Sequence, residues 1–75
     1  MKKTVLITGT SSGFGAAVAH FFAEKGWNVI ATMRDTHKAG DLRNSDNVLI
    51  TKLDVQDAVT IESAIAAGIE RFGRI

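Results

Sequence analysis

The sequence of residues 3–15 is Lys-Thr-Val-Leu-Ile-Thr-Gly-Thr-Ser-Ser-Gly-Phe-Gly, and this stretch decides the fold. Val5, Leu6 and Ile7 form a short, continuous apolar run that ends at a glycine turn. Such a run is typical of a strand that is buried on both faces of a parallel sheet. It predicts a strand over residues 3–8.

The residues after the glycine turn are spaced like one face of a helix. Large side chains recur at helical intervals, with alanines filling much of the remainder: Phe14, Val18, Phe21, Phe22 and Lys25. This spacing predicts an amphipathic helix. Gly26 follows directly and is a residue type that commonly ends a helix.

The rest of the chain repeats this alternation. Residues 27–33 predict a second strand, and the polar segment 36–46 predicts a short helix or a loop. Residues 48–53 predict a third strand, and residues 61–73 have helical spacing that ends at Gly73. The order β-α-β-α-β-α predicts an α/β fold with a doubly wound parallel sheet, the Rossmann arrangement.

Composition excludes several classes of protein. The chain has 75 residues, 45% of them hydrophobic, which is enough for one globular unit. Its net charge is +1 with scattered Lys and Arg, so nucleic-acid binding is not expected. It has no cysteine, so disulfides are excluded. No apolar run is long enough for a signal peptide or a membrane span, and a cytoplasmic location is expected.

The glycine turn is the strongest candidate site, because it joins the first predicted strand to the first predicted helix, where a doubly wound sheet binds its ligand. Its three glycines, Gly9, Gly13 and Gly15, let the backbone approach a diphosphate closely. The free N–H groups and the dipole of the following helix favour an anion. Three hydroxyl groups can reach phosphate or ribose oxygens, those of Thr10, Ser11 and Ser12.

A tight turn without a ligand is the alternative interpretation of these glycines, and the position of the turn favours nucleotide binding over it. No Lys-Ser or Lys-Thr pair follows the glycines, which disfavours a phosphate-binding loop of the ATPase type. A dinucleotide is therefore the predicted ligand. The spacing Gly-x-x-x-Gly-x-Gly also differs from the Gly-x-Gly-x-x-Gly pattern of other Rossmann dehydrogenases.

The chain resembles the short-chain dehydrogenase/reductase family. Residues 8–15 match that family's cofactor motif, Thr-Gly-x-x-x-Gly-x-Gly. Leu53-Asp54-Val55 is similar to the family's segment after its third strand, and residues 71–75 are similar to its approach to a fourth strand. The resemblance implies that the whole chain is the N-terminal part of an NAD(P)-binding Rossmann domain, with strand four onward missing.

The resemblance also implies roles for particular residues. Ser11, Ser12 and the backbone at Phe14 would surround the ribose and the diphosphate, while Asp54 and Val55 would bind the adenine. A loop position beside the next helix N-terminus is the alternative for Asp54, because a negative charge is mildly favoured there. The two interpretations are compatible.

The end of the second predicted strand decides between NAD and NADP. An acidic side chain there would accept a hydrogen bond from the ribose 2′-OH and repel a 2′-phosphate, but the residue is Met33. The next residue, Arg34, can bind a 2′-phosphate with its guanidinium, so NADP is predicted. Asp35 keeps NAD as the alternative, since it could pair with Arg34 or contact the ribose.

No residue of the chain is assigned a catalytic role. The family's reaction is hydride transfer between a nicotinamide and a carbonyl or alcohol, and it uses a tyrosine, a lysine and a serine. The chain has no tyrosine and ends before the segment expected to carry these residues. His20 and His37 are expected to be structural or solvated rather than metal ligands.

Three interpretations of function follow. The first is a fragment of an NADP-dependent short-chain oxidoreductase that acts on a small carbonyl or alcohol substrate and forms a homo-oligomer. The second is a non-catalytic dinucleotide-binding sensor or interaction module that uses the same fold. The third is a folding fragment with no cellular role of its own.

Overall fold

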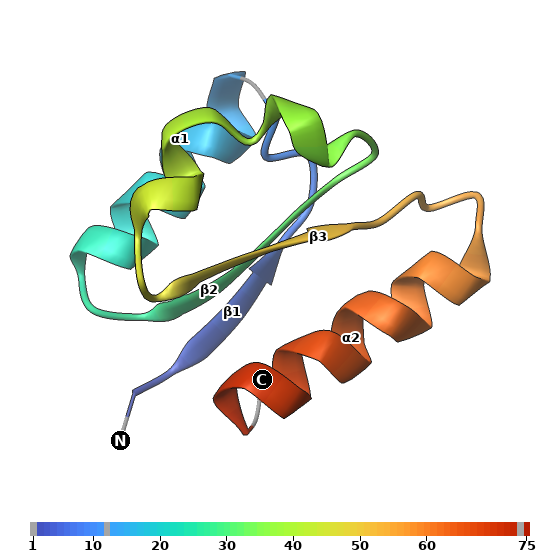
Figure 1. Cartoon of the computed structure of the whole chain (residues 1–75). Coiled ribbons are helices and arrows are strands. Elements are labelled where there is room, and N and C mark those ends of the chain that lie inside the picture. The colour runs from blue at the N-terminus through green and yellow to red at the C-terminus, as the bar shows by residue number, and fades with distance from the viewer. Residues whose placement is uncertain (1, 12, 74) are drawn as a thin grey trace.

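The computed structural model describes residues 2–11, 13–73 and 75, and within them three parallel strands form one sheet (Figure 1). The strands are β1 (Thr4–Ile7), β2 (Asn28–Met33) and β3 (Val48–Lys52), in the order β1-β2-β3. The central residue pairs place Ile30 of β2 opposite Leu6 on one side and Leu49 on the other. The predicted α/β fold is confirmed, and each strand agrees with its prediction to within one residue at either end.

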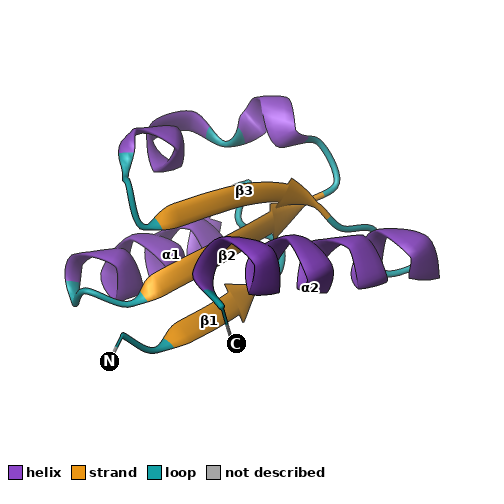
Figure 2. Ribbon diagram, turned by 60° about the horizontal axis from the view of Figure 1, so that its bottom comes forward, coloured by secondary structure: helices purple, strands orange, loops and turns teal. Residues whose placement is uncertain are grey.

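The two long helices cover opposite faces of the sheet (Figure 2). They are α1 (Gly13–Glu24) and α2 (Ala58–Phe72). The segment between β2 and β3 forms two short 3-10 helices, η1 (Thr36–Lys38) and η2 (Gly40–Asn44). No helix in the described part of the chain is both long enough and apolar enough to cross a membrane.

Glycines end both long helices, as predicted. Gly26 follows α1 and Gly73 follows α2, and each has a φ of 85°, in the left-handed region that favours glycine. The Gly73 N–H donates a hydrogen bond to the Ile69 carbonyl at 2.7 Å, which closes the last turn of α2.

The central strand β2 supplies the core on both faces of the sheet. Val29 and Ala31 are fully buried on the face covered by α1, where they pack in one cluster with Ala19 and Leu42. Ile30 points to the other face and is also fully buried, against α2. This alternation follows from the two-residue period of a strand.

The apolar face of α1 was predicted correctly only in part. Phe14 is 85% exposed and Phe21 is 55% exposed, whereas Ala19 is fully buried and Phe22 packs against the core. The stripe that faces the sheet therefore begins at Gly15 and not at Phe14. The physical reason is that glycine and alanine let the helix approach the sheet closely, so the Phe14 and Phe21 rings lie beside the contact rather than in it.

Candidate functional site

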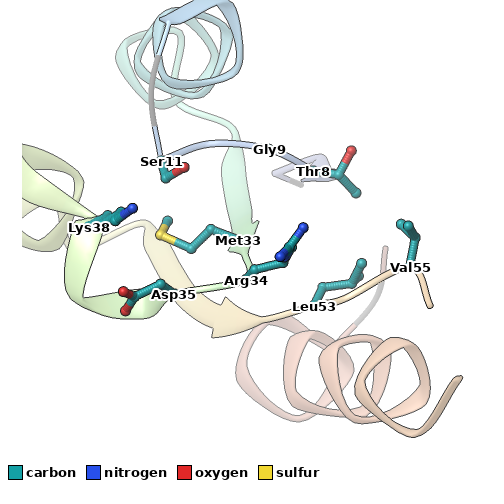
Figure 3. Close-up of a pocket in the computed structure, with 9 residues that line it drawn as sticks. All are labelled: Thr8, Gly9, Ser11, Met33, Arg34, Asp35, Lys38, Leu53 and Val55. Atoms are coloured by element: carbon teal, nitrogen blue, oxygen red, sulfur yellow. The ribbon is translucent and has the colours of Figure 1, made fainter. Parts of the chain in front are cut away.

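A cavity of about 500 Å³ lies at the carboxyl ends of the three strands, which is where sheets of this type bind ligands (Figure 3). Its volume lies in the range of small-molecule sites. The segments that follow all three strands contribute to its wall: Thr8, Gly9 and Ser11 after β1; Met33, Arg34, Asp35 and Lys38 around the end of β2; Leu53 and Val55 after β3.

The glycine turn adopts backbone angles that glycine alone adopts easily. Gly9 has a φ of 69° and Gly13 a φ of 58°. A Cβ built on Gly9 meets no other atom within 4 Å, so the Gly9 backbone is open on that side. The turn can therefore present its main chain directly to a ligand in the cavity.

The third glycine of the motif has a different role. A Cβ built on Gly15 would lie 2.8 Å from the carbonyl carbon of Gly9 and closer still to its oxygen. The first turn of α1 is thus packed directly on the backbone of the glycine turn, and no side chain fits between them. This contact fixes the helix N-terminus beside the cavity, with no acidic side chain in the first turn of the helix.

Hydrogen bonds tie the glycine turn to the central strand. The backbone N–H of Thr10 donates to the Thr32 carbonyl at 3.1 Å, and the Thr10 hydroxyl donates to the same oxygen at 3.0 Å. The Thr32 hydroxyl in turn donates to the Ile7 carbonyl at 2.8 Å. Both threonines are almost completely buried, at 1% and 0% exposure.

These contacts correct the expectation for Thr10. Its hydroxyl was expected to reach a phosphate or ribose oxygen, but it is buried and bound to the backbone of β2. A buried hydroxyl satisfies its hydrogen-bonding capacity inside the protein, because leaving it unpaired is costly. Thr10 therefore shapes the turn, and Ser11 is the hydroxyl residue that lines the cavity.

Replacing Thr32 with valine tests the hydrogen bond from the Thr32 hydroxyl to the Ile7 carbonyl. The substitution keeps the shape of the side chain and removes the hydrogen bond to Ile7, so we expect a loss of about 1 kcal/mol in the free energy of unfolding. Chemical denaturation would measure it. Thr51→Val is the matched control, because Thr51 pairs with Thr32 in register but is only half-buried, so its loss is expected to be smaller. An equal effect of both substitutions would contradict a stabilising role of the Thr32–Ile7 hydrogen bond.

Asp54 and Val55 were both predicted to bind the adenine, but only Val55 lies on the cavity wall. Val55 lines the cavity and is 73% exposed. Asp54 does not line it, and its Oδ1 accepts a hydrogen bond from the Gln56 N–H at 2.9 Å. The Thr60 hydroxyl lies 2.9 Å from the Asp54 nitrogen and 3.0 Å from its carbonyl oxygen. The loop interpretation thus accounts for this carboxylate, and its contact with adenine remains a prediction.

The strand-two side places charged groups on the cavity wall. Met33 is 2% exposed at the end of β2, and the next residue, Arg34, is exposed and lines the cavity. Asp35 also lines the cavity, but its Oδ1 accepts a hydrogen bond from the His37 N–H at 3.0 Å and caps η1. Figure 3 shows the Arg34 and Asp35 side chains pointing in different directions.

The structure brings together only part of the predicted site. Four predicted residues line the cavity: Gly9, Ser11, Arg34 and Val55. Five others lie outside its wall: Thr10, Gly13, Phe14, Gly15 and Asp54. Ser12, the remaining predicted residue, lies outside the described residues.

Sequence reasoning missed Lys38, which lies on the cavity wall at the end of η1. The available signal was its position in the polar segment shortly after Arg34. That signal was weak, because a short polar segment can place its side chains in many directions.

Three features together define a dinucleotide-binding protein of the Rossmann type: a parallel sheet, a glycine turn between its first strand and first helix, and a cavity at the carboxyl edge of the sheet. Residues 3–75 match the sequence model described as "short chain dehydrogenase". The chain therefore belongs to the short-chain dehydrogenase family, whose members are oxidoreductases that bind a dinucleotide cofactor.

Individual relatives agree with this assignment. The chain is 39% identical over 79 residues to a sulfoacetaldehyde reductase of Chromohalobacter salexigens, a match that covers 100% of this chain and 31% of the relative. It is 37% identical over 65 residues to an NADP-dependent 3-hydroxy acid dehydrogenase of Escherichia coli, covering 84% of this chain and 26% of the relative. It thus spans a quarter to a third of the length of these relatives.

A solved structure confirms the fold. The chain superimposes with a TM-score of 0.89 on the 3-ketoacyl-(acyl-carrier-protein) reductase of Brucella melitensis, whose crystal structure is a complex with NADH. The two are 32% identical in sequence, and the match covers 97% of this chain and 31% of the reductase.

Proposed function

We propose that this chain binds NADP in the cavity and is the cofactor-binding part of an oxidoreductase that acts on a carbonyl or alcohol substrate. The observation that carries the choice of cofactor is the exposed Arg34 on the cavity wall, directly after the buried end of β2. Family membership supports a dinucleotide, while the position of this guanidinium supports the 2′-phosphorylated form.

The wall of the cavity suits the common part of such a cofactor. The open backbone at Gly9 and the nearby N-terminus of α1 provide a place for the diphosphate. The Ser11 hydroxyl can bond a phosphate or ribose oxygen. Leu53 and Val55, in the segment after β3, offer apolar surface where the adenine would pack.

The charges at the end of β2 support NADP over NAD. An NAD site of this fold uses an acid to accept from the ribose 2′-OH. Here the strand ends in Met33, and the carboxylate of the nearby Asp35 accepts from the backbone of η1. Arg34 offers a planar set of donors that matches a phosphate group.

The names of the relatives support both cofactors. One curated relative is called NADP-dependent, whereas the similar solved structure contains NADH. The proposed preference of this chain therefore rests on its own residues. When bound, the reduced cofactor supplies the hydride of the reaction, and the residues described above bind and orient it.

Replacing Arg34 with glutamine tests the proposal. We expect the unaltered chain to bind NADP more tightly than NAD. We expect Arg34→Gln to weaken NADP binding about ten-fold or more, because a hydrogen bond to a charged group contributes roughly 1.5–3 kcal/mol. NAD binding should change little, since NAD has no 2′-phosphate. Isothermal titration calorimetry with both cofactors measures the two affinities.

Arg71→Gln is the matched control for this experiment. Arg71 is also an exposed arginine, but it lies in the last turn of α2 and donates to the Asp46 carbonyl at 3.0 Å, away from the cavity wall. Its substitution should leave both affinities unchanged. Tighter binding of NAD than of NADP by the unaltered chain would refute the choice of cofactor, and binding of neither would refute the proposed function.

A further inference from the structure

The polar segment after β2 places a second cation on the cavity wall. Arg34 directly follows the strand, and Lys38 is the last residue of η1. Both side chains are exposed, and both line the same cavity. The Lys38 amino group points toward the side of the cavity on which Ser11 lies (Figure 3).

A hydrogen bond from the neighbouring backbone orders the helix that carries this lysine. The Asp35 carboxylate accepts from the His37 N–H at 3.0 Å and so caps the first turn of η1. The Lys38 N–H donates to the Asp35 carbonyl at 3.1 Å, which closes the same turn. Asp35 thus helps to determine the backbone conformation that places Lys38 on the cavity wall.

We propose that Lys38 is a specificity-determining residue that binds the 2′-phosphate of the cofactor together with Arg34. The inference rests on the proposed function, because it assigns a further residue to the same site. It also gives Asp35 a definite role. Its carboxylate accepts from the His37 N–H and so positions Lys38 through η1.

The balance of charge supports two cations rather than one. A phosphate monoester carries about −1.5 to −2 charges near neutral pH, so one guanidinium neutralises only part of it. Lys38 adds a second cation to the same wall and so also offsets the negative charge of Asp35, which lines the cavity as well. The ribose 2′-OH of NAD is neutral, so Lys38 adds nothing to the binding of NAD and increases the preference for NADP.

Adenosine 2′,5′-bisphosphate and 5′-AMP are suitable probes, because they differ only by the 2′-phosphate. We expect Lys38→Gln to weaken the binding of adenosine 2′,5′-bisphosphate about five-fold, the effect of an exposed charge pair. The affinity for 5′-AMP should stay the same. Lys38→Arg should keep most of the affinity for the bisphosphate. The difference in affinity between the unaltered chain and the Lys38→Gln variant should shrink at high salt, because exposed charges are screened.

Lys52→Gln is the matched control, since Lys52 is an exposed lysine at the end of β3 that does not line the cavity. Its substitution should leave the preference for the bisphosphate unchanged. If Lys38→Gln changes neither affinity, or lowers both equally, the assignment of Lys38 is wrong. If Arg34→Gln still removes the preference in that case, the proposed function stands without Lys38. If the unaltered chain binds neither probe, both proposals fail.

Discussion

Replacing Gly15 with alanine is expected to abolish cofactor binding. It is also expected to lower the free energy of unfolding by about 3 kcal/mol, the upper end of the usual cost of inserting a methyl group into a packed site. The added Cβ would lie 2.8 Å from the Gly9 carbonyl carbon and closer to its oxygen. Both are backbone atoms, so no side chain can rotate to make room. The helix N-terminus must move away from the Gly9 backbone, which opens the glycine turn.

The expected change in the free energy of unfolding has the opposite sign to that of an ordinary glycine-to-alanine substitution in a helix. Glycine to alanine inside a helix normally stabilises by about 1 kcal/mol. Thermal denaturation, and titration with NADP, would measure the two effects. Ala17→Ser is the control, because it adds one atom at an exposed position of the same helix and should cost only about 0.5 kcal/mol through helix propensity. A Gly15→Ala variant as stable as the unaltered chain would show that the contact does not exist.

Replacing Gly68 with alanine is expected to lower the free energy of unfolding by about 2 kcal/mol, the result of overpacking offset by a gain in helix propensity. Gly68 is buried in α2 where the helix crosses β2. A Cβ there would lie 3.0 Å from the Ile30 Cγ1 and closer to its Cδ1. Because Ile30 is itself fully buried, its side chain has little room to move.

A double substitution distinguishes this clash from other causes. Ile30→Val removes the Cδ1 atom and alone should cost about 0.5–1.5 kcal/mol. Combined with Gly68→Ala it should cost clearly less than the sum, because the main clash is gone. Ala66→Gly at an exposed position of α2 measures the propensity effect separately. Additive losses in the double variant, or stabilisation by Gly68→Ala alone, would contradict this account of the packing.

Local patterns were sufficient for the order of elements and for most of their boundaries. The three strands and the two long helices were predicted from the apolar run before Gly9, the glycines after the helices, and the change between the strand period and the helix period. These features are local, because strand and helix periods and helix ends depend on neighbouring residues. The same holds for the position of the glycine turn, which the motif places at the edge of the sheet.

The composition of the cavity wall could be predicted only in part. Arg34 was identified because it directly follows a strand, and the strand direction determines where the next residue lies. Lys38 was missed because its position depends on η1, and η1 depends on the cap from Asp35. Sequence spacing alone does not indicate which backbone N–H a carboxylate will accept from.

The sequence by itself determined the class of fold, the family and the place of the glycine turn, because each follows from a local pattern or a motif. Only the tertiary structure decided which side of α1 meets the sheet, since hydrophobicity favoured Phe14 while close packing required Gly15. It also decided that the Thr10 hydroxyl binds the Thr32 carbonyl, because a buried hydroxyl needs a hydrogen-bond partner inside the protein. The Thr10–Thr32 hydrogen bond joins residues 22 positions apart in the chain. Both contacts form only when the strands and helices pack together.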